Sequence, residues 1–191
     1  MDQRPGPDLA ADLAADLAAD LAADVDGAFP AFVDRFGGDV FTLARRVSDA
    51  SAAEDIAQDA FVRAHKALRS YSPSRTASLE LRPWVLTIAL NVARNHLRTA
   101  SCRTTVPMDD GRRPSPLRSH PDPAVTASDR LDLAGALASL PLAARQAVVL
   151  RHVIGCSTAE TAAVLGRPEG TVKAQVSRAL AAMRDRLEDR P

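Results

Sequence analysis

The chain is poor in cysteine and aromatic residues, and it has no long apolar run. Its two cysteines, Cys102 and Cys156, form no CxxC pair, which argues against a disulfide framework and against a zinc site. Aromatic residues make up only 4% of the sequence, so a β-sandwich core is not expected. No apolar run approaches the roughly 20 residues that cross a bilayer, and the N-terminus is acidic where a signal peptide would be basic. These absences predict a cytoplasmic protein with reduced thiols and no membrane insertion.

The sequence also lacks a recognisable catalytic or cofactor-binding pattern. Its four histidines are scattered, at positions 65, 96, 120 and 152. No nucleophile is paired with a base in a known motif, and no glycine-rich phosphate loop is present. We therefore expect no enzyme activity, no cofactor and no metal site.

Alanine and leucine dominate the apolar residues, and this composition favours helices that pack through small side chains. The formal net charge is zero, but the charge is unevenly distributed. Residues 1–26 hold seven Asp and one Arg, whereas residues 82–113 and 167–186 are both basic. Two basic patches on separate segments are typical of proteins that bind nucleic acid.

The acidic N-terminal extension is a repeat. Residues 8–24 repeat Asp-Leu-Ala-Ala four times and end on Asp24. The period of four places the leucines on one helical stripe and the aspartates on another. Because aspartates at i,i+4 repel each other, we expect residues 1–26 to form a helix that is marginal or depends on a partner.

Residues 28–68 carry apolar side chains at helical spacing, which predicts two helices. The pair Gly37-Gly38 is expected to break or bend the first helix. Ser51-Ala-Ala-Glu54 has the form of a capping box and predicts the start of the second helix. Beside its apolar stripe, the second helix has a polar face formed by Glu54, Asp55, Gln58 and Asp59.

Residues 71–82 are rich in serine and other small polar residues, which predicts a loop. Pro83 suits the first turn of a following helix. In that helix Trp84 belongs to the apolar side, and a polar face carries Thr87, Asn91, Arg94, Asn95 and Arg98. Residues 103–127 hold five prolines and several serines, which predicts a flexible linker.

A second helical block starts near Ser128 and includes a helix that Pro141 opens and Gly155 closes. Ser157-Thr-Ala-Glu160 is a further capping-box sequence. The helix that it starts ends at Gly166, and a short turn leads into another helix. Two helices joined in this way form a helix-turn-helix, whose second helix enters the major groove of DNA.

The second helix of this motif presents polar and basic side chains outward. Lys173 and Arg178 can donate to guanine or to phosphate, and Gln175 can pair with the adenine edge. Thr171 can hold a phosphate near the helix N-terminus. The alternative is an ordinary helical hairpin with a solvated basic face, but the capping, the glycine turn and the charge together favour a DNA reader.

Two blocks of the chain resemble one family. Residues 54–61 (EDIAQDAF), 84–91 (WVLTIALN) and 94–98 (RNHLR) are similar to region 2 of bacterial sigma factors. Residues 140–150 (LPLAARQAVVL), 160–166 (ETAAVLG) and 170–180 are similar to region 4. Both regions, in this order and with only a short linker between them, resemble the extracytoplasmic-function class.

The helical pattern and this resemblance predict an all-α fold of two small helical domains joined by a flexible Pro-rich linker. The implied division is an acidic extension over 1–26, sigma region 2 over 27–100, the linker over 101–127 and the region 4 helix-turn-helix over 128–188. The resemblance implies promoter-specific transcription initiation, with core RNA polymerase, promoter DNA and an anti-sigma factor as partners.

The resemblance also implies roles for individual residues. The polar face of Glu54, Asp55, Gln58 and Asp59 falls where the family docks on core polymerase. Residues 71–82 match the segment that captures a flipped base, and the implied −10 residues are Tyr71, Trp84, Asn91, Arg94, Asn95 and Arg98. Trp84 is a candidate stacking wedge, although its apolar neighbours favour a core position. The implied −35 residues are Thr171, Lys173, Ala174, Gln175, Ser177 and Arg178.

The chain departs from the family pattern at Ala174-Gln175, where Ser-Arg is common, so one cationic contact is missing. An alternative function is a two-domain helix-turn-helix regulator that acts without core polymerase. Such a regulator would need an N-terminal receiver or ligand domain, and residues 1–127 show neither alternating strands nor an acidic phosphoacceptor pocket. A requirement for core polymerase in DNA binding distinguishes the two functions.

Overall fold

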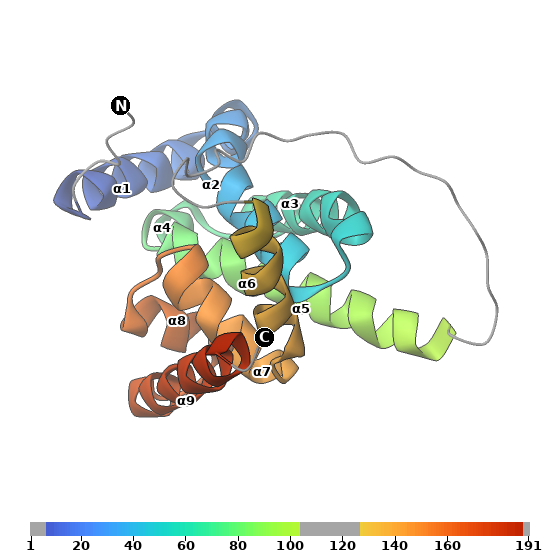
Figure 1. Cartoon of the computed structure of the whole chain (residues 1–191). Coiled ribbons are helices and arrows are strands. Elements are labelled where there is room, and N and C mark those ends of the chain that lie inside the picture. The colour runs from blue at the N-terminus through green and yellow to red at the C-terminus, as the bar shows by residue number, and fades with distance from the viewer. Residues whose placement is uncertain (1–6, 104–126, 189–191) are drawn as a thin grey trace.

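The computed structural model describes residues 7–103 and 127–188, and Figure 1 shows them as helices packed in two groups. No β-strand occurs in these two ranges, which agrees with the predicted all-α fold. The predicted linker over 101–127 lies outside the described residues except at its ends. Residues 101–103 continue helix α5, and Ala127 begins helix α6.

The N-terminal group is a bundle in which α2, α3 and α5 pack against one another. Apolar residues at helical spacing form its core, and Phe32, Phe36, Ile56 and Leu86 are each at most 1% exposed. The elements are α1 (Pro7–Ala23), α2 (Val25–Val47), the 3-10 turn η1 (Ala50–Ala52), α3 (Ala53–Ser70), α4 (Pro73–Ala77) and α5 (Leu81–Arg103).

Helix α1 packs its second half onto this bundle, where it contacts α2 and α4. Leu17 and Leu21 are buried, whereas Leu13 is 48% exposed. Asp16 and Asp20 lie on the exposed side. Burial of Leu17 and Leu21 explains why the helix forms despite repulsion along the aspartate stripe, since tertiary packing supplies most helix stability in proteins.

Two local predictions for the bundle are wrong. Helix α2 continues through Gly37 and Gly38, because its apolar face is buried on both sides of the glycine pair. Ser51 does not cap α3, because residues 50–52 form η1 and Asp49 caps that turn by accepting the Ser51 N–H at 3.2 Å. Helix α3 then begins at Ala53 without a side-chain cap.

The segment 71–82, predicted as a loop, contains a short helix. Ser72 caps α4 by accepting the N–H of Arg75 at 3.3 Å, and Pro73 occupies the first helical position, where its missing N–H costs nothing. Helix α5 begins at Leu81, so Pro83 lies in its first turn as predicted.

The C-terminal group is built around α9, which contacts α6, α7 and α8. Pro141 precedes α7, and Gly155, with a φ of 81°, follows the π-helical turn η2. Both positions agree with the sequence prediction. The elements are α6 (Ala127–Ser139), α7 (Leu142–Val148), η2 (Val149–Val153), α8 (Thr158–Leu165) and α9 (Glu169–Glu188).

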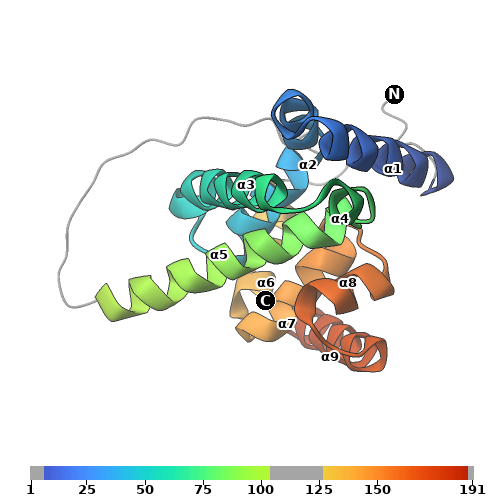
Figure 2. The same cartoon turned by 180° about the vertical axis from the view of Figure 1, so that it is seen from behind.

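The two groups pack directly against each other. Helix α5 contacts α8, while α2 contacts α7 and η2. Figure 2 shows α5 running between α3 and the C-terminal helices. This arrangement places Arg94, on the polar side of α5, against α7 of the C-terminal group.

Candidate nucleic-acid interface

Helices α8 and α9 form a helix-turn-helix with the predicted local geometry. Ser157 Oγ accepts the N–H of Glu160 at 3.0 Å, and Glu160 Oε2 accepts the N–H of Ser157 at 2.7 Å, which confirms the capping box. Helix α8 ends at Gly166, whose φ of 63° lies in the left-handed region that favours glycine. The carbonyl of Pro168 then accepts the N–H of Val172 at 3.1 Å, which starts α9.

Helix α9 buries an apolar stripe and exposes a polar face. Arg178 Nε donates to the Ala174 carbonyl at 3.2 Å. Arg167 lies in the turn before α9, and its Nη1 donates to Gln175 Oε1 at 2.7 Å. Arg167 is not among the predicted site residues, because its contact with Gln175 spans eight positions of the sequence. The predicted −35 residues Thr171, Lys173, Ala174, Ser177 and Arg178 are exposed, and Gln175 is half-buried.

The polar face of α3 is not uniform. Asp55 and Gln58 are exposed, whereas Glu54 and Asp59 are half-buried. Asp59 Oδ2 lies 2.9 Å from Nη2 of Arg63, one turn further along the helix. Glu54 Oε1 is buried and has no hydrogen-bond partner among the described residues. Asp55 and Gln58 are therefore the side chains of this face that extend furthest into solvent.

The polar face of α5 is assembled as predicted, but the C-terminal domain contacts one of its members. Asn91, Asn95 and Arg98 are exposed, and Arg98 Nη2 donates to Asn95 Oδ1 at 2.8 Å. Arg94 is half-buried, and its Nη2 donates to Oε1 of Gln146 in α7 at 2.7 Å. Burial, with a further contribution from the charge of Arg167, lowers the pKa of Arg94.

Tyr71 and Trp84 lie at the end of the bundle, beside α4. Their ring centroids are 6.2 Å apart, and Trp84 is equally far from Phe32 in the core. The Arg75 guanidinium carbon lies 3.7 Å from the centroid of the Tyr71 ring, a cation–π distance. Trp84 is half-buried, so it connects the core to the surface aromatic ring.

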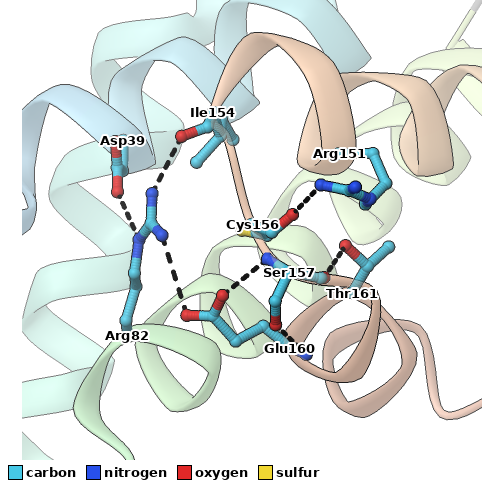
Figure 3. Close-up of polar contacts among 8 residues, drawn as sticks. All are labelled: Asp39, Arg82, Arg151, Ile154, Cys156, Ser157, Glu160 and Thr161. Carbon is cyan, nitrogen blue, oxygen red and sulfur yellow. Dashed lines mark hydrogen bonds and ion pairs between the residues drawn. The ribbon is translucent and has the colours of Figure 1, made fainter. Parts of the chain in front are cut away.

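Arg82 joins the two domains, as Figure 3 shows. Its Nε donates to Asp39 Oδ2 in α2 at 2.9 Å, and its Nη2 donates to the carbonyl of Ile154 at 2.8 Å. Its Nη1 lies 3.6 Å from Glu160 Oε1. Burial disfavours the charged form, but the carboxylates of Asp39 and Glu160 help to raise the pKa of Arg82 above its ordinary value. The guanidinium therefore stays charged at the interface.

Cys156 lies beside this arginine and is fully buried. Burial raises the pKa of its thiol to about 12, and Glu160 and Asp39 add to the increase. Its carbonyl accepts from Arg151 Nη1 at 2.6 Å. This interdomain cluster could not be predicted from the sequence, because its members come from distant segments that share no local pattern.

Neither a metal site nor a membrane-spanning helix is found among the residues that the structure describes. The described residues include no group of three His, Cys, Asp or Glu side chains that could hold a metal ion. Within the same part of the chain, none of the helices combines the length and the apolar character needed to cross a bilayer.

Comparison with protein families identifies both halves of the chain. Residues 32–102 match the model of sigma-70 region 2, and residues 130–183 match that of sigma-70 region 4. The ECF RNA polymerase sigma factor SigC of Mycobacterium tuberculosis is 32% identical over 152 residues, which cover 80% of this chain and 79% of that protein. SigL of the same species is 34% identical over 145 residues, covering 76% of this chain and 80% of SigL.

Two solved structures share the arrangement of helices. CnrH, in complex with the cytosolic domain of CnrY, has a TM-score of 0.66 and 25% identity, with coverage of 93% of this chain and 99% of CnrH. RpoE of Bartonella quintana, in complex with the anti-sigma factor NepR, has the same TM-score and identity, with coverage of 85% and 98%. The chain therefore belongs to the ECF family of RNA polymerase sigma factors, whose function is promoter-specific transcription initiation.

Proposed function

We propose that this sigma factor holds a promoter at two points while it is docked on core RNA polymerase. Helix α5 and the segment 71–80 read and melt the −10 element, and α9 reads the −35 element. The observation that supports this proposal most directly is that regions 2 and 4 occur in order on one chain. Region 4 also presents an exposed basic helix, α9. A regulator that acts without polymerase is not favoured, because a match to region 2 stands where a receiver domain would be needed.

Polymerase docking is assigned to the polar face of α3, formed by Glu54, Asp55, Gln58 and Asp59. The exposure of Asp55 and Gln58 supports this assignment. Glu54 supports the docking assignment as well, because its Oε1 is buried without a hydrogen-bond partner among the described residues. A buried oxygen of this kind raises the free energy of the folded protein until a donor satisfies it. A donor from the polymerase would satisfy that oxygen.

Recognition of the −10 element is assigned to Asn91, Arg94, Asn95 and Arg98 on α5, with Tyr71 and Trp84 at its start. Flipping a base out of a duplex costs a few kcal/mol. Stacking on an aromatic ring and contacts with cations can offset that cost. The ring of Tyr71 with Arg75 against it offers both kinds of contact.

Recognition of the −35 element is assigned to Thr171, Lys173, Ala174, Gln175, Ser177 and Arg178. These residues belong to the first half of α9, which is the part of a recognition helix that meets base edges. Thr171 lies in the first turn of the helix, where backbone N–H groups favour a phosphate.

The corresponding division of the chain is an extension over 1–26, region 2 over 27–100, a linker over 101–127 and region 4 over 128–188. The sigma factor acts in the cytoplasm, where the polymerase is. It catalyses no reaction itself, since phosphodiester bond formation belongs to the polymerase.

An anti-sigma factor is the proposed regulatory partner. The structure of RpoE that shares this fold holds the anti-sigma factor NepR. Co-purification from the native cell tests this partner, and recovery of polymerase subunits alone under all conditions would contradict it.

Reconstitution with purified core polymerase tests the main proposal. We expect promoter-specific transcripts, and mapping of their start sites should reveal shared −35 and −10 sequences.

Variants test the three assigned surfaces separately. The D55A/Q58A variant should weaken core binding, and the N91A/N95A variant should weaken promoter melting. The K173A variant should weaken −35 binding. R184A removes an exposed cation further along α9 and is the matched control. The absence of a specific transcript from every genomic template would refute the proposal.

A further inference from the structure

Arg167 brings a cation to the recognition helix α9 from outside that helix. The helix carries Lys173 and Arg178 on its outer face, with Ala174 and Gln175 between them. Arg167 comes from the turn before the helix, yet its guanidinium reaches the second turn of α9 and donates to Gln175 Oε1 at 2.7 Å. The two side chains therefore form one polar unit at the N-terminal end of the recognition helix.

This contact changes what Gln175 can recognise. A free glutamine amide offers one acceptor and donors side by side, which matches the N6 donor and N7 acceptor of adenine. In this structure the acceptor oxygen faces the Arg167 guanidinium. The guanidinium occupies one of the two lone pairs of that oxygen and places its positive charge beside it. The groups that the unit then offers are mainly donors, namely the glutamine amide N–H groups and the other N–H groups of the arginine.

A row of donors is complementary to guanine, whose major-groove edge carries the acceptors O6 and N7. Adenine presents its N6 amino group at the same position, and two donors would then face each other. We propose that Arg167 and Gln175 act together as a guanine-reading pair in the −35 element. This inference rests on the proposed role of α9 at that element, and it assigns a specificity-determining residue outside the recognition helix.

A phosphate contact is the competing role for Arg167, because a guanidinium also binds phosphate in a bidentate manner. A phosphate contact and a base contact differ in whether they distinguish one base pair from another. Phosphate contacts fix position without reading sequence, whereas base contacts depend on the base pair. Base preference, rather than affinity, therefore tests the proposal.

The experiment uses holoenzyme assembled from full-length protein and core polymerase. Duplex promoters carry each of the four base pairs at every position of the mapped −35 element. We expect the wild-type protein to prefer guanine at one position by about tenfold, within the range of a good bidentate contact. R167A and Q175A should each abolish that preference, and the double variant should lose no more, because the two residues act as one unit.

Two variants serve as controls. R167K keeps the charge but loses the planar fork that joins Gln175 to the base, so it should retain affinity and show a weaker guanine preference. R184A, which removes an exposed cation further along α9, should leave the preference of the Arg167–Gln175 position unchanged. Both partners lie at the surface, and equal melting temperatures would show that the variants are folded.

Uniform weakening by R167A on all four base pairs would show a phosphate contact and overturn the proposal. An adenine preference in the wild-type protein that persists in R167A would also overturn it, because Gln175 would then read the base alone. Wild-type holoenzyme that shows no dependence on any −35 base would instead refute the role of α9, and with it this inference. The three outcomes are distinguishable in one set of templates.

Discussion

Glu160 makes two contacts that substitutions can separate. Its Oε2 completes the capping box of α8, and its Oε1 lies 3.6 Å from Arg82 across the domain interface. Glu160→Gln keeps an acceptor for the cap and removes the charge. We expect E160A to lower the free energy of unfolding by about 1 kcal/mol, as loss of a cap does, and E160Q to lower it less.

Urea denaturation of both variants, with S157A as a reference for the cap, measures this difference. Ser157 supplies the other half of the box without contacting Arg82 in the contacts described. If E160Q destabilises the protein as much as E160A, the ion pair with Arg82 contributes more than the cap.

Substitution by alanine should change the stability of the protein in opposite directions at Gly166 and at Gly38. At Gly166 the φ of 63° strains any residue with a Cβ, so G166A should destabilise the protein by about 1 kcal/mol. At Gly38, inside α2, a Cβ would meet nothing within 4 Å. Because alanine has the higher helix propensity, G38A should stabilise it by about 1 kcal/mol. Thermal unfolding measures both; destabilisation by G38A would show that α2 needs a glycine there.

At the scale of elements, the same sequence signal led to one correct and one wrong prediction. Ser157-Glu160 and Ser51-Glu54 both have a serine followed three residues later by glutamate. The first forms a capping box, but Asp49 draws residues 50–52 into a 3-10 turn and displaces the second. The helices themselves were predictable, because apolar spacing is a property of each segment. Their exact starts depended on competition between neighbouring caps.

The N-terminal helix gives a prediction at this scale. Leu21 is fully buried, whereas Leu13, two repeats earlier, is 48% exposed. We expect L21A to destabilise the protein by about 3 kcal/mol through lost burial and a residual cavity, and L13A by less than about 0.5 kcal/mol. Equilibrium denaturation compares them. Equal small effects would mean that α1 detaches from the bundle in solution, as a marginal helix would.

For the whole molecule, the packing of one domain on the other could not be predicted from the sequence. The contacts of Arg82 with Ile154 and of Arg94 with Gln146 join residues 72 and 52 positions apart. No periodicity or motif specifies such pairs. The consequence is functional, because Arg94 belongs to the face assigned to the −10 element. In the proposed complex, contact of Arg94 with promoter DNA would require its hydrogen bond with Gln146 to break.

The reactivity of the Cys156 thiol can report separation of the two domains. Its thiol is buried beside Arg82, and its pKa is raised to about 12. Since the thiolate is the reactive form, a thiol reagent should modify it very slowly at pH 8 in a C102S background. We expect R82A to accelerate the modification, because the substitution removes the bonds to Asp39 and Ile154 that hold the domains together. R69A, which removes an exposed cation of α3, is the matched control.

Binding of core polymerase and promoter should accelerate modification of the wild-type thiol in the same way. The raised pKa also gives a sign for the pH dependence. The closed arrangement is stabilised below the ordinary thiol pKa of 9.0 and loses this contribution as pH rises toward about 12. Modification of the closed protein should therefore increase more steeply with pH than that of the R82A variant. Equal rates and equal pH profiles in the two proteins would show that the domains are already apart in free solution.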